Sequence, residues 1–179
     1  MRKPRFGSRF TKERFVLYIA VGVAFMSIAI ANATTSWLKK DWKKDDVFGD
    51  EYQGLWKICY DQPNRGLTTS CHERIGDTLL HVVRTGMCLS FLLYAVVLGY
   101  LIAMQFRSDL AITPVGLTLI VSAMFALFGL TFFIATEDIP RTHWLFTIKY
   151  GYSFGFGWFG MLLSMITGLV CISIPKVEY

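Results

Sequence analysis

The chain is organised around one segment, Gly54-Leu55-Trp56-Lys57-Ile58-Cys59, which is followed by Cys71. The sequence on either side of it consists of apolar stretches of membrane length and short connections. This segment instead combines aromatic and β-branched residues with a pair of cysteines, inside a connection that is too long and too rich in such residues for a plain linker. We therefore expect the function of the molecule to lie here.

Four apolar stretches surround the segment, and 54% of the 179 residues are hydrophobic while only 17% are charged. Each stretch is close to the roughly 20 residues that a helix needs to cross the hydrocarbon core of a bilayer. The sequence thus predicts one membrane domain over residues 1–179, an all-α four-helix bundle. Its predicted spans are residues 15–34, 78–104, 112–135 and 150–174, separated by connections over residues 35–77, 105–111 and 136–149, with tails at 1–14 and 175–179.

The excess of positive charge indicates how the chain crosses the membrane. The net charge is +5, and most of the excess precedes the first span, where Glu13 is the one acid. By the positive-inside rule the amino terminus lies in the cytosol, and four spans return the carboxyl terminus to the same side. We expect a multi-pass plasma-membrane protein with an uncleaved first helix and no nucleic-acid partner. The basic residues concerned are Arg2, Lys3, Arg5, Arg9, Lys12 and Arg14.

The long connection over residues 35–77 then lies outside the cell. Runs around residues 37–43, 52–60 and 67–72 have the β-branched and aromatic content of strands, and turn signals separate them. The sequence predicts a small extracellular antiparallel β-sheet. Asn32-Ala33-Thr34 has the pattern of a glycosylation site, but its position at the membrane edge favours a polar helix end over a sugar attachment site.

Topology divides the four cysteines. Cys59 and Cys71 lie in the oxidising outer compartment, and a disulfide between them would add roughly 3 kcal/mol of stability. A metal site is a poor rival, because nearby His72 and Glu73 are too few ligands. Cys88 lies within the second span, and Cys171, near the cytosolic end of the fourth, is either a buried thiol or a palmitoylation site.

Arg84 lies well inside the second span. An arginine at that depth must be paired, because an unpaired charge in hydrocarbon is costly. The structural interpretation, a peg that fastens the sheet to the bundle, is favoured over a pore or ion-coupling charge. No catalytic motif is present, and the three histidines are scattered, so we expect no enzymatic activity, no cofactor and no metal.

Small residues recur along the fourth span and permit close helix packing. This pattern is consistent either with packing inside the bundle, which is favoured, or with a partner surface. The candidate partner surface consists of Gly151, Gly155, Gly160, Ser164 and Gly168, with Trp144 in the outer connection before the span.

Trp37, Gly54-Leu55-Trp56, Cys59 and Cys71, in the first outer loop of a four-span protein, resemble the signature of the claudin superfamily. That superfamily includes claudins, epithelial membrane and peripheral myelin proteins, and stargazin-like calcium-channel gamma subunits. Arg84 resembles the arginine that these proteins carry near the outer start of their second helix. The aromatic and glycine-rich segment 150–158 is similar to the start of their fourth helix.

The resemblance implies a left-handed four-helix bundle topped by an extracellular sheet of about five strands, four from the first outer loop and one from the second. Trp56 would insert at the top of the bundle near the membrane surface, where its indole would be buried between sheet and bundle. The disulfide would brace two adjacent strands.

Two functions follow from the resemblance. The first is a claudin-like contact protein of cell junctions, which associates with itself or with related proteins in cis and in trans and forms a paracellular barrier or ion-selective path. There the outer loops, including the turn over residues 139–144, would meet the neighbouring cell, and the charges between Lys39 and Asp50 nearly cancel. The alternative is an auxiliary subunit of an ion channel or receptor, held through the third and fourth spans. The tail after the fourth span, ending in Tyr179, carries only a weak PDZ-binding pattern.

Overall fold

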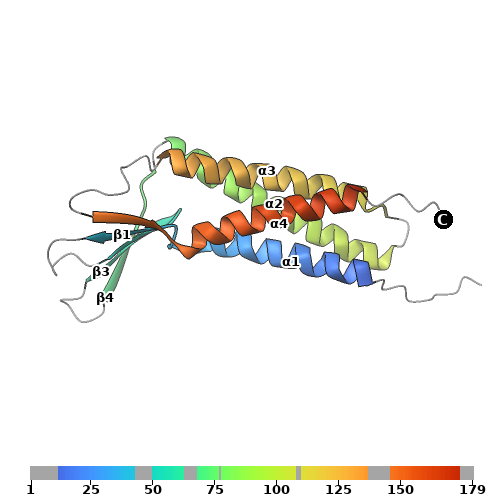
Figure 1. Cartoon of the computed structure of the whole chain (residues 1–179), viewed down its shortest axis with the longest axis horizontal. Coiled ribbons are helices and arrows are strands. Elements are labelled where there is room, and N and C mark those ends of the chain that lie inside the picture. The colour runs from blue at the N-terminus through green and yellow to red at the C-terminus, as the bar shows by residue number, and fades with distance from the viewer. Residues whose placement is uncertain are drawn as a thin grey trace, which may run out of the picture.

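The computed structural model describes residues 12–42, 50–62, 68–76, 78–107, 110–136 and 146–173. Four helices run side by side along the long axis, and a sheet lies at one end of them (Figure 1). The first turn of α1 and the last turn of α4 lie at the opposite end. The helices are α1 (Lys12–Ala33), α2 (Thr78–Phe106), α3 (Thr113–Thr136) and α4 (Tyr152–Ser173).

All four helices are long and apolar enough to cross a membrane. Their large apolar side chains divide between the inside of the bundle and its outer surface. On α2, for example, Val83, Met87 and Tyr94 are buried, whereas Leu92 and Val96 are more than half exposed. The buried positions recur at intervals of three or four residues, as expected for one face of a helix. The exposed apolar face is the one that a bilayer would cover.

Glycines allow a close approach between the backbones of α3 and α4. A Cβ atom added at Gly116 would lie 2.8 Å from the carbonyl oxygen of Gly168, and one added at Gly168 would lie 2.9 Å from that of Gly116. Because carbon and oxygen atoms do not approach so closely, each position accepts only glycine without a shift of the helices. The two backbones therefore pack directly against each other.

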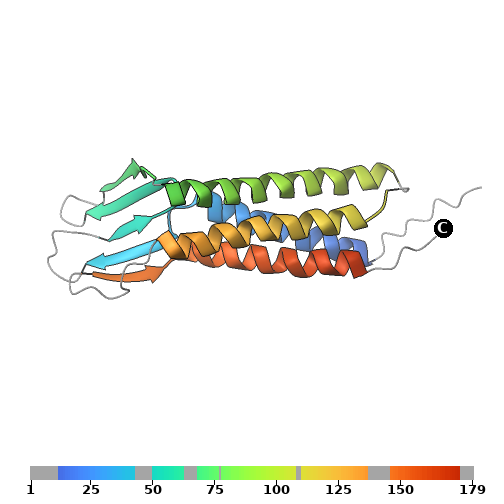
Figure 2. The ribbon, with the colours of Figure 1, turned by 90° about the horizontal axis from the view of Figure 1, so that it is seen from above.

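The sheet has five antiparallel strands in the order β4-β3-β2-β1-β5. Figure 2 shows these strands fanning out beyond one end of the helices. The connection between α1 and α2 contributes four strands and the connection between α3 and α4 contributes one, as the family resemblance implied. The strands are β1 (Leu38–Trp42), β2 (Glu51–Gln53), β3 (Lys57–Gln62), β4 (Thr68–Glu73) and β5 (Phe146–Tyr150).

The predicted boundaries differ from the observed ones by one or more residues at several places, and two of these differences have a clear structural cause. The run 52–60, predicted as one strand, is divided between β2 and β3, because Gly54-Leu55-Trp56 forms the turn between them and the amide of Gly54 donates to the carbonyl of Lys57 (2.8 Å). Tyr150, predicted as the start of the fourth span, ends β5 instead. The Gly151 amide donates to the Trp37 carbonyl (2.9 Å). This hydrogen bond holds Gly151 against the segment that follows α1, and α4 therefore begins at Tyr152.

Candidate functional site

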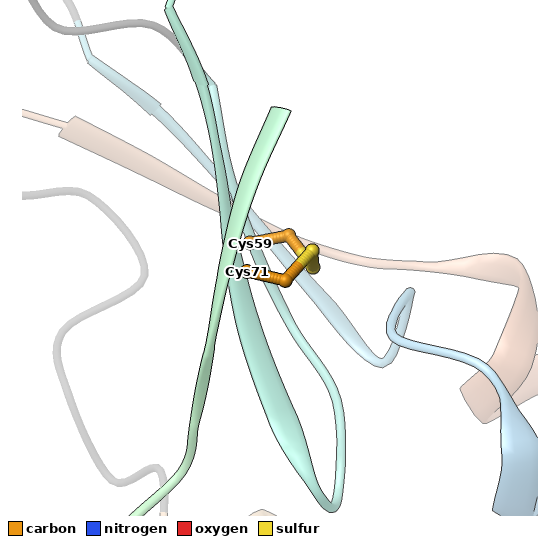
Figure 3. Close-up of a disulfide and its surroundings, with 2 residues drawn as sticks. All are labelled: Cys59 and Cys71. Carbon is orange, nitrogen blue, oxygen red and sulfur yellow. A yellow bond between two sulfur atoms is a disulfide. The ribbon is translucent and has the colours of Figure 1, made fainter. Parts of the chain in front are cut away.

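The predicted disulfide braces the β3–β4 edge of the sheet. Cys59 on β3 and Cys71 on β4 are direct partners in the antiparallel register, and their sulfur atoms are bonded at 2.05 Å. Figure 3 shows both side chains projecting from the same side of the two strands. Strand β4 is an edge strand of the sheet, so the disulfide fixes a strand that has only one neighbour to hold it.

Trp37 anchors the start of the sheet in the top of the bundle. Its side chain is completely buried, and its indole Nε1 donates to the Ala31 carbonyl of α1 (2.6 Å). The ring contacts Phe133 of α3 edge-on and also lies against Phe154 of α4. A buried indole with its N–H satisfied contributes a large apolar area without leaving a polar group unpaired. Trp37 therefore joins three helices to the first strand.

The Trp56 side chain is more exposed than the family resemblance implied. Its side chain is 42% exposed, although its Nε1 donates to the Asn32 carbonyl at the end of α1 (3.0 Å). The buried indole expected between sheet and bundle is that of Trp37. Trp56 instead lies at the edge of the junction, with the Arg84 guanidinium 5.1 Å from the centre of its ring. The signature pattern contained both tryptophans but did not show which one the helices enclose.

Arg84 connects α2 to the sheet through backbone carbonyl groups. Its Nε donates to the carbonyl of Leu55 (2.8 Å), and its Nη2 donates to the carbonyl of Arg74 (2.7 Å). Both acceptors flank the strand pair β3 and β4. The guanidinium thus satisfies its charge with peptide dipoles and the Trp56 ring, which is the geometry of a peg between the sheet and the helix.

The turn between β2 and β3 is held from two sides. Nη1 of Arg74 donates to the Gly54 carbonyl (3.1 Å). On the other side, a Cβ atom added at Gly54 would lie 2.6 Å from the Cα atom of Thr35. The backbone after α1 therefore occupies the space of a side chain at this turn, which explains why glycine precedes Leu55 and Trp56 in the signature.

Charged side chains form a network over β5, β1 and the start of β2. Lys39 lies 2.6 Å from Asp50 and 3.1 Å from Asp41, and Lys149 of β5 lies 2.6 Å from the other oxygen of Asp41. The hydrogen bonds to Asp50 and Asp41 raise the pKa of Lys39, and the hydrogen bond from Lys149 lowers the pKa of Asp41. Two positive and two negative groups balance, so the network carries no net charge at neutral pH.

The opposite face of the sheet carries a buried polar group. Glu51 is 6% exposed and accepts a hydrogen bond from Nε2 of Gln53, while Lys40 lies 3.6 Å from the same carboxylate oxygen. Burial, and then the charge of Glu51, raise the pKa of neighbouring Tyr60. Sequence reasoning missed this cluster. The available signal was the run of three charged residues, Lys39, Lys40 and Asp41, along one strand. Because neighbouring strand residues point to opposite faces, Lys40 must lie on the face opposite to Lys39 and Asp41 and needs a partner there.

The small-residue stripe of α4 is mostly covered by the chain itself, in agreement with the favoured interpretation, packing inside the bundle. Gly160 packs against Ile28 of α1, Ser164 donates to the Leu119 carbonyl of α3 (3.1 Å), and Gly168 packs against α3. A Cβ atom added at Gly151 would overlap the Ser36 carbonyl. Gly155 alone of the stripe faces open space. Trp144 and the turn over residues 139–144 lie outside the described residues.

A polar layer inside the bundle was also missed. The hydroxyl groups of Ser90 on α2 and Ser122 on α3 lie 3.0 Å apart, and the Tyr94 hydroxyl donates to the Gly160 carbonyl of α4 (3.2 Å). All these side chains are fully buried. Small polar residues at buried positions of apolar helices are the sequence signal for such interhelical hydrogen bonds.

Two candidate modification sites are engaged in the fold. The Asn32 amide nitrogen donates to the Ile28 carbonyl of its own helix (3.0 Å) and lies 3.5 Å from the Met87 carbonyl of α2. The Cys171 side chain is completely buried, whereas Cys88 is partly exposed. In this conformation Cys171 fits the predicted buried thiol and is inaccessible to palmitoylation. Within the described residues, no group of three or more His, Cys, Asp or Glu side chains is arranged to hold a metal ion.

Comparison with protein families agrees with this architecture. The sequence model of the PMP-22/EMP/MP20/Claudin family matches residues 15–171, which include all four helices almost completely and the whole sheet. A comparison with individual curated proteins finds no match. Because the family match covers most of the chain, and the four spans, the sheet and the disulfide accompany it, the chain belongs to the PMP-22/EMP/MP20/Claudin family.

Proposed function

We propose that this protein mediates contact between cells, with its extracellular sheet as the contact surface and with itself or related proteins as partners. The observation that carries the proposal is the attachment of the sheet. Arg84 binds two carbonyl groups at its base, Trp37 is enclosed by the helices, and the disulfide fixes an edge strand. A surface that is ordered before it binds avoids the entropic cost of ordering on association.

The charge network supports association between like surfaces. Lys39 and Lys149 lie opposite each other on β1 and β5, and Asp41, two residues along β1, forms an ion pair with both. A second copy in antiparallel orientation can place its own acidic group against the lysines and its lysines against Asp41. Such complementarity gives specificity and orientation more than affinity. Because the network is neutral, it supports an adhesive or barrier role and favours neither cations nor anions.

The alternative function, an auxiliary subunit of a channel or receptor, is less well supported, because one candidate surface for a pore subunit is covered. The small-residue stripe of α4 was the surface offered to a pore subunit, and Gly160, Ser164 and Gly168 are occupied by α1 and α3. The exposed face of α3 remains available, with Leu117 and Phe128 each more than half exposed. Lipid covers such a face as readily as a partner does, so it does not favour the auxiliary role.

The test is a mixed-cell assay with the full-length fluorescent protein in plasma membranes of cells that lack cell junctions. We expect fluorescence to concentrate where two expressing cells touch and to stay at the membrane average where an expressing cell touches a non-expressing one. Equal fluorescence at both kinds of contact, after normalisation to surface protein, would contradict self-association between cells. Related proteins expressed in the second cell extend the test to mixed pairs.

Affinity purification in mild detergent separates the two roles. Recovery of the protein with itself and related proteins supports the contact role. Recovery of a channel or receptor subunit in a near-integer ratio would instead establish the auxiliary role, whatever the imaging shows.

A further inference from the structure

An unusually exposed apolar side chain lies between the sheet and α2. Ile75 is 98% exposed, the highest value of any large apolar residue in the described part of the chain. It lies in the short connection between the end of β4 at Glu73 and the start of α2 at Thr78. Single exposed apolar residues are common on soluble surfaces, so its significance depends on its surroundings.

The surroundings place Ile75 at the membrane boundary. Thr78, the first residue of α2, is three positions further along the chain, and three residues span at most about 10 Å. The headgroup region on each side of a bilayer is about 5–8 Å thick. Figure 2 shows that α2 begins level with the other helices on the sheet side and extends past them on the opposite side. The extra length of α2 therefore does not lift Ile75 away from the outer leaflet.

The first turns of α2, a few residues after Ile75, also carry exposed apolar side chains. Leu79 and Val82, in the first turns of α2, are 43% and 44% exposed. The amide of Arg74 donates to the carbonyl of Trp56 (2.9 Å), so Ile75 directly follows the backbone pair that carries the exposed Trp56 ring. Tryptophan is enriched at membrane interfaces, because its ring is apolar while its N–H requires a polar partner. Here the Asn32 carbonyl supplies that partner.

We propose that Ile75 and Trp56 form a lipid-binding anchor that inserts into the outer leaflet and holds the β4 edge of the sheet at the membrane surface. The partner is the interfacial region of a phospholipid bilayer. The anchor continues the lipid-facing surface of Leu79 and Val82 past the end of the helix. Together with the Arg84 peg, it fixes how far the sheet stands from the bilayer along this edge.

The test places the photo-crosslinking amino acid p-benzoylphenylalanine at position 75 of the full chain, which is reconstituted in phosphatidylcholine nanodiscs. Because the Ile75 side chain is almost fully exposed, the replacement removes no packing contact. Leu79 is the matched lipid-facing position, and exposed Thr69 on β4 is the matched position on the sheet. After irradiation, intact-protein mass spectrometry measures the fraction carrying one added phospholipid.

We expect the lipid adduct at position 75 to approach the yield at position 79 and to exceed that at position 69 several-fold. A yield no higher than at position 69 would show that Ile75 faces water and would overturn the anchor. Nanodiscs loaded with two copies provide the second comparison. A crosslinked dimer formed at position 75 in preference to the lipid adduct would also overturn it, since the residue would then contact a second copy of the chain.

Discussion

Two tryptophans of one signature take opposite environments at the boundary between sheet and bundle. Trp37 is completely buried among three helices, whereas Trp56 is 42% exposed beside Arg84. Each indole N–H nevertheless donates to a carbonyl near the end of α1. At the scale of single residues, therefore, the junction is made by side-chain donors that satisfy backbone carbonyl groups where the helices end and the strands begin.

The Arg84 peg leads to a direct prediction. Arg84→Gln should lower the free energy of unfolding by about 2–4 kcal/mol, because the carbonyls of Leu55 and Arg74 lose charge-assisted hydrogen bonds. The free energy of unfolding of Arg84→Lys should lie between those of the native protein and Arg84→Gln, since one ammonium group cannot reproduce the two-donor geometry of the guanidinium. Thermal unfolding in detergent micelles measures both, with the exposed Arg107→Gln as control. Equal stability of the lysine variant and the native protein would show that charge alone matters.

At the scale of helices and strands, the sequence predicted which elements exist better than it predicted the residues at which they begin and end. The four spans were found because their apolar stretches have membrane length, and two of the five strands, β1 and β4, were recognised within a few residues. The run 52–60 was misassigned because the turn at Gly54 depends on contact with Thr35, which belongs to another segment. The family resemblance, and no local pattern, indicated the strand of the second loop.

The small-residue stripe shows the same limit. Glycine and serine at four-residue intervals indicate a closely packed helix face but not the identity of its neighbour. Gly160 and Gly168 meet α1 and α3, and Gly155 meets nothing within 4 Å. A pattern within one helix contains no information about the order of helices around a bundle, so the sequence left packing and partner binding as alternatives.

Helix packing can be tested by comparing a glycine that is packed against another helix with a glycine that faces open space. Gly168→Ala should destabilise the bundle by about 1–3 kcal/mol, because its Cβ would meet the Gly116 carbonyl at 2.9 Å and overpacking costs this much. Gly99→Ala on α2 meets nothing within 4 Å and should be neutral or stabilising by up to about 1 kcal/mol, the helix preference of alanine. Unfolding measured in one detergent compares them. Equal effects would contradict the close α3–α4 contact.

The ion pair between β1 and β5 predicts a pH effect. The hydrogen bond from Lys149 lowers the pKa of Asp41 in the folded protein. The pair therefore stabilises the fold at pH values above the unfolded pKa, about 4, and this contribution is lost as the pH falls through the lower, folded value. Because Lys149 is 64% exposed, we expect only about 0.2–1 kcal/mol.

The measurement compares the native protein with Asp41→Asn in unfolding experiments from pH 7 to pH 3. The stability difference should shrink as the pH falls below about 4. High salt should reduce it at neutral pH. Glu73→Gln, outside the network, serves as the control, and a difference that stays constant across the range would exclude an ionic origin.

At the scale of the whole molecule, the sheet and the bundle are connected at several separate points. Arg84 attaches α2 to the base of β3 and β4, Trp37 joins β1 to three helices, and the Gly151 amide binds the Trp37 carbonyl at the start of α4. With connections at both sides of the sheet, neither part can lose its structure without breaking contacts of the other. We therefore expect one cooperative unfolding transition.

The disulfide tests this coupling. Replacing both Cys59 and Cys71 by serine should lower the free energy of unfolding by roughly 3 kcal/mol, because the unfolded loop is no longer closed. If sheet and bundle are one unit, helical circular dichroism and tryptophan fluorescence should still report a single midpoint, shifted downward together. Cys88→Ser, which removes a free thiol, should leave that midpoint nearly unchanged. Separate midpoints, with the helices melting at the native temperature, would mean that the sheet unfolds alone and that the pegs do not transmit stability to the bundle.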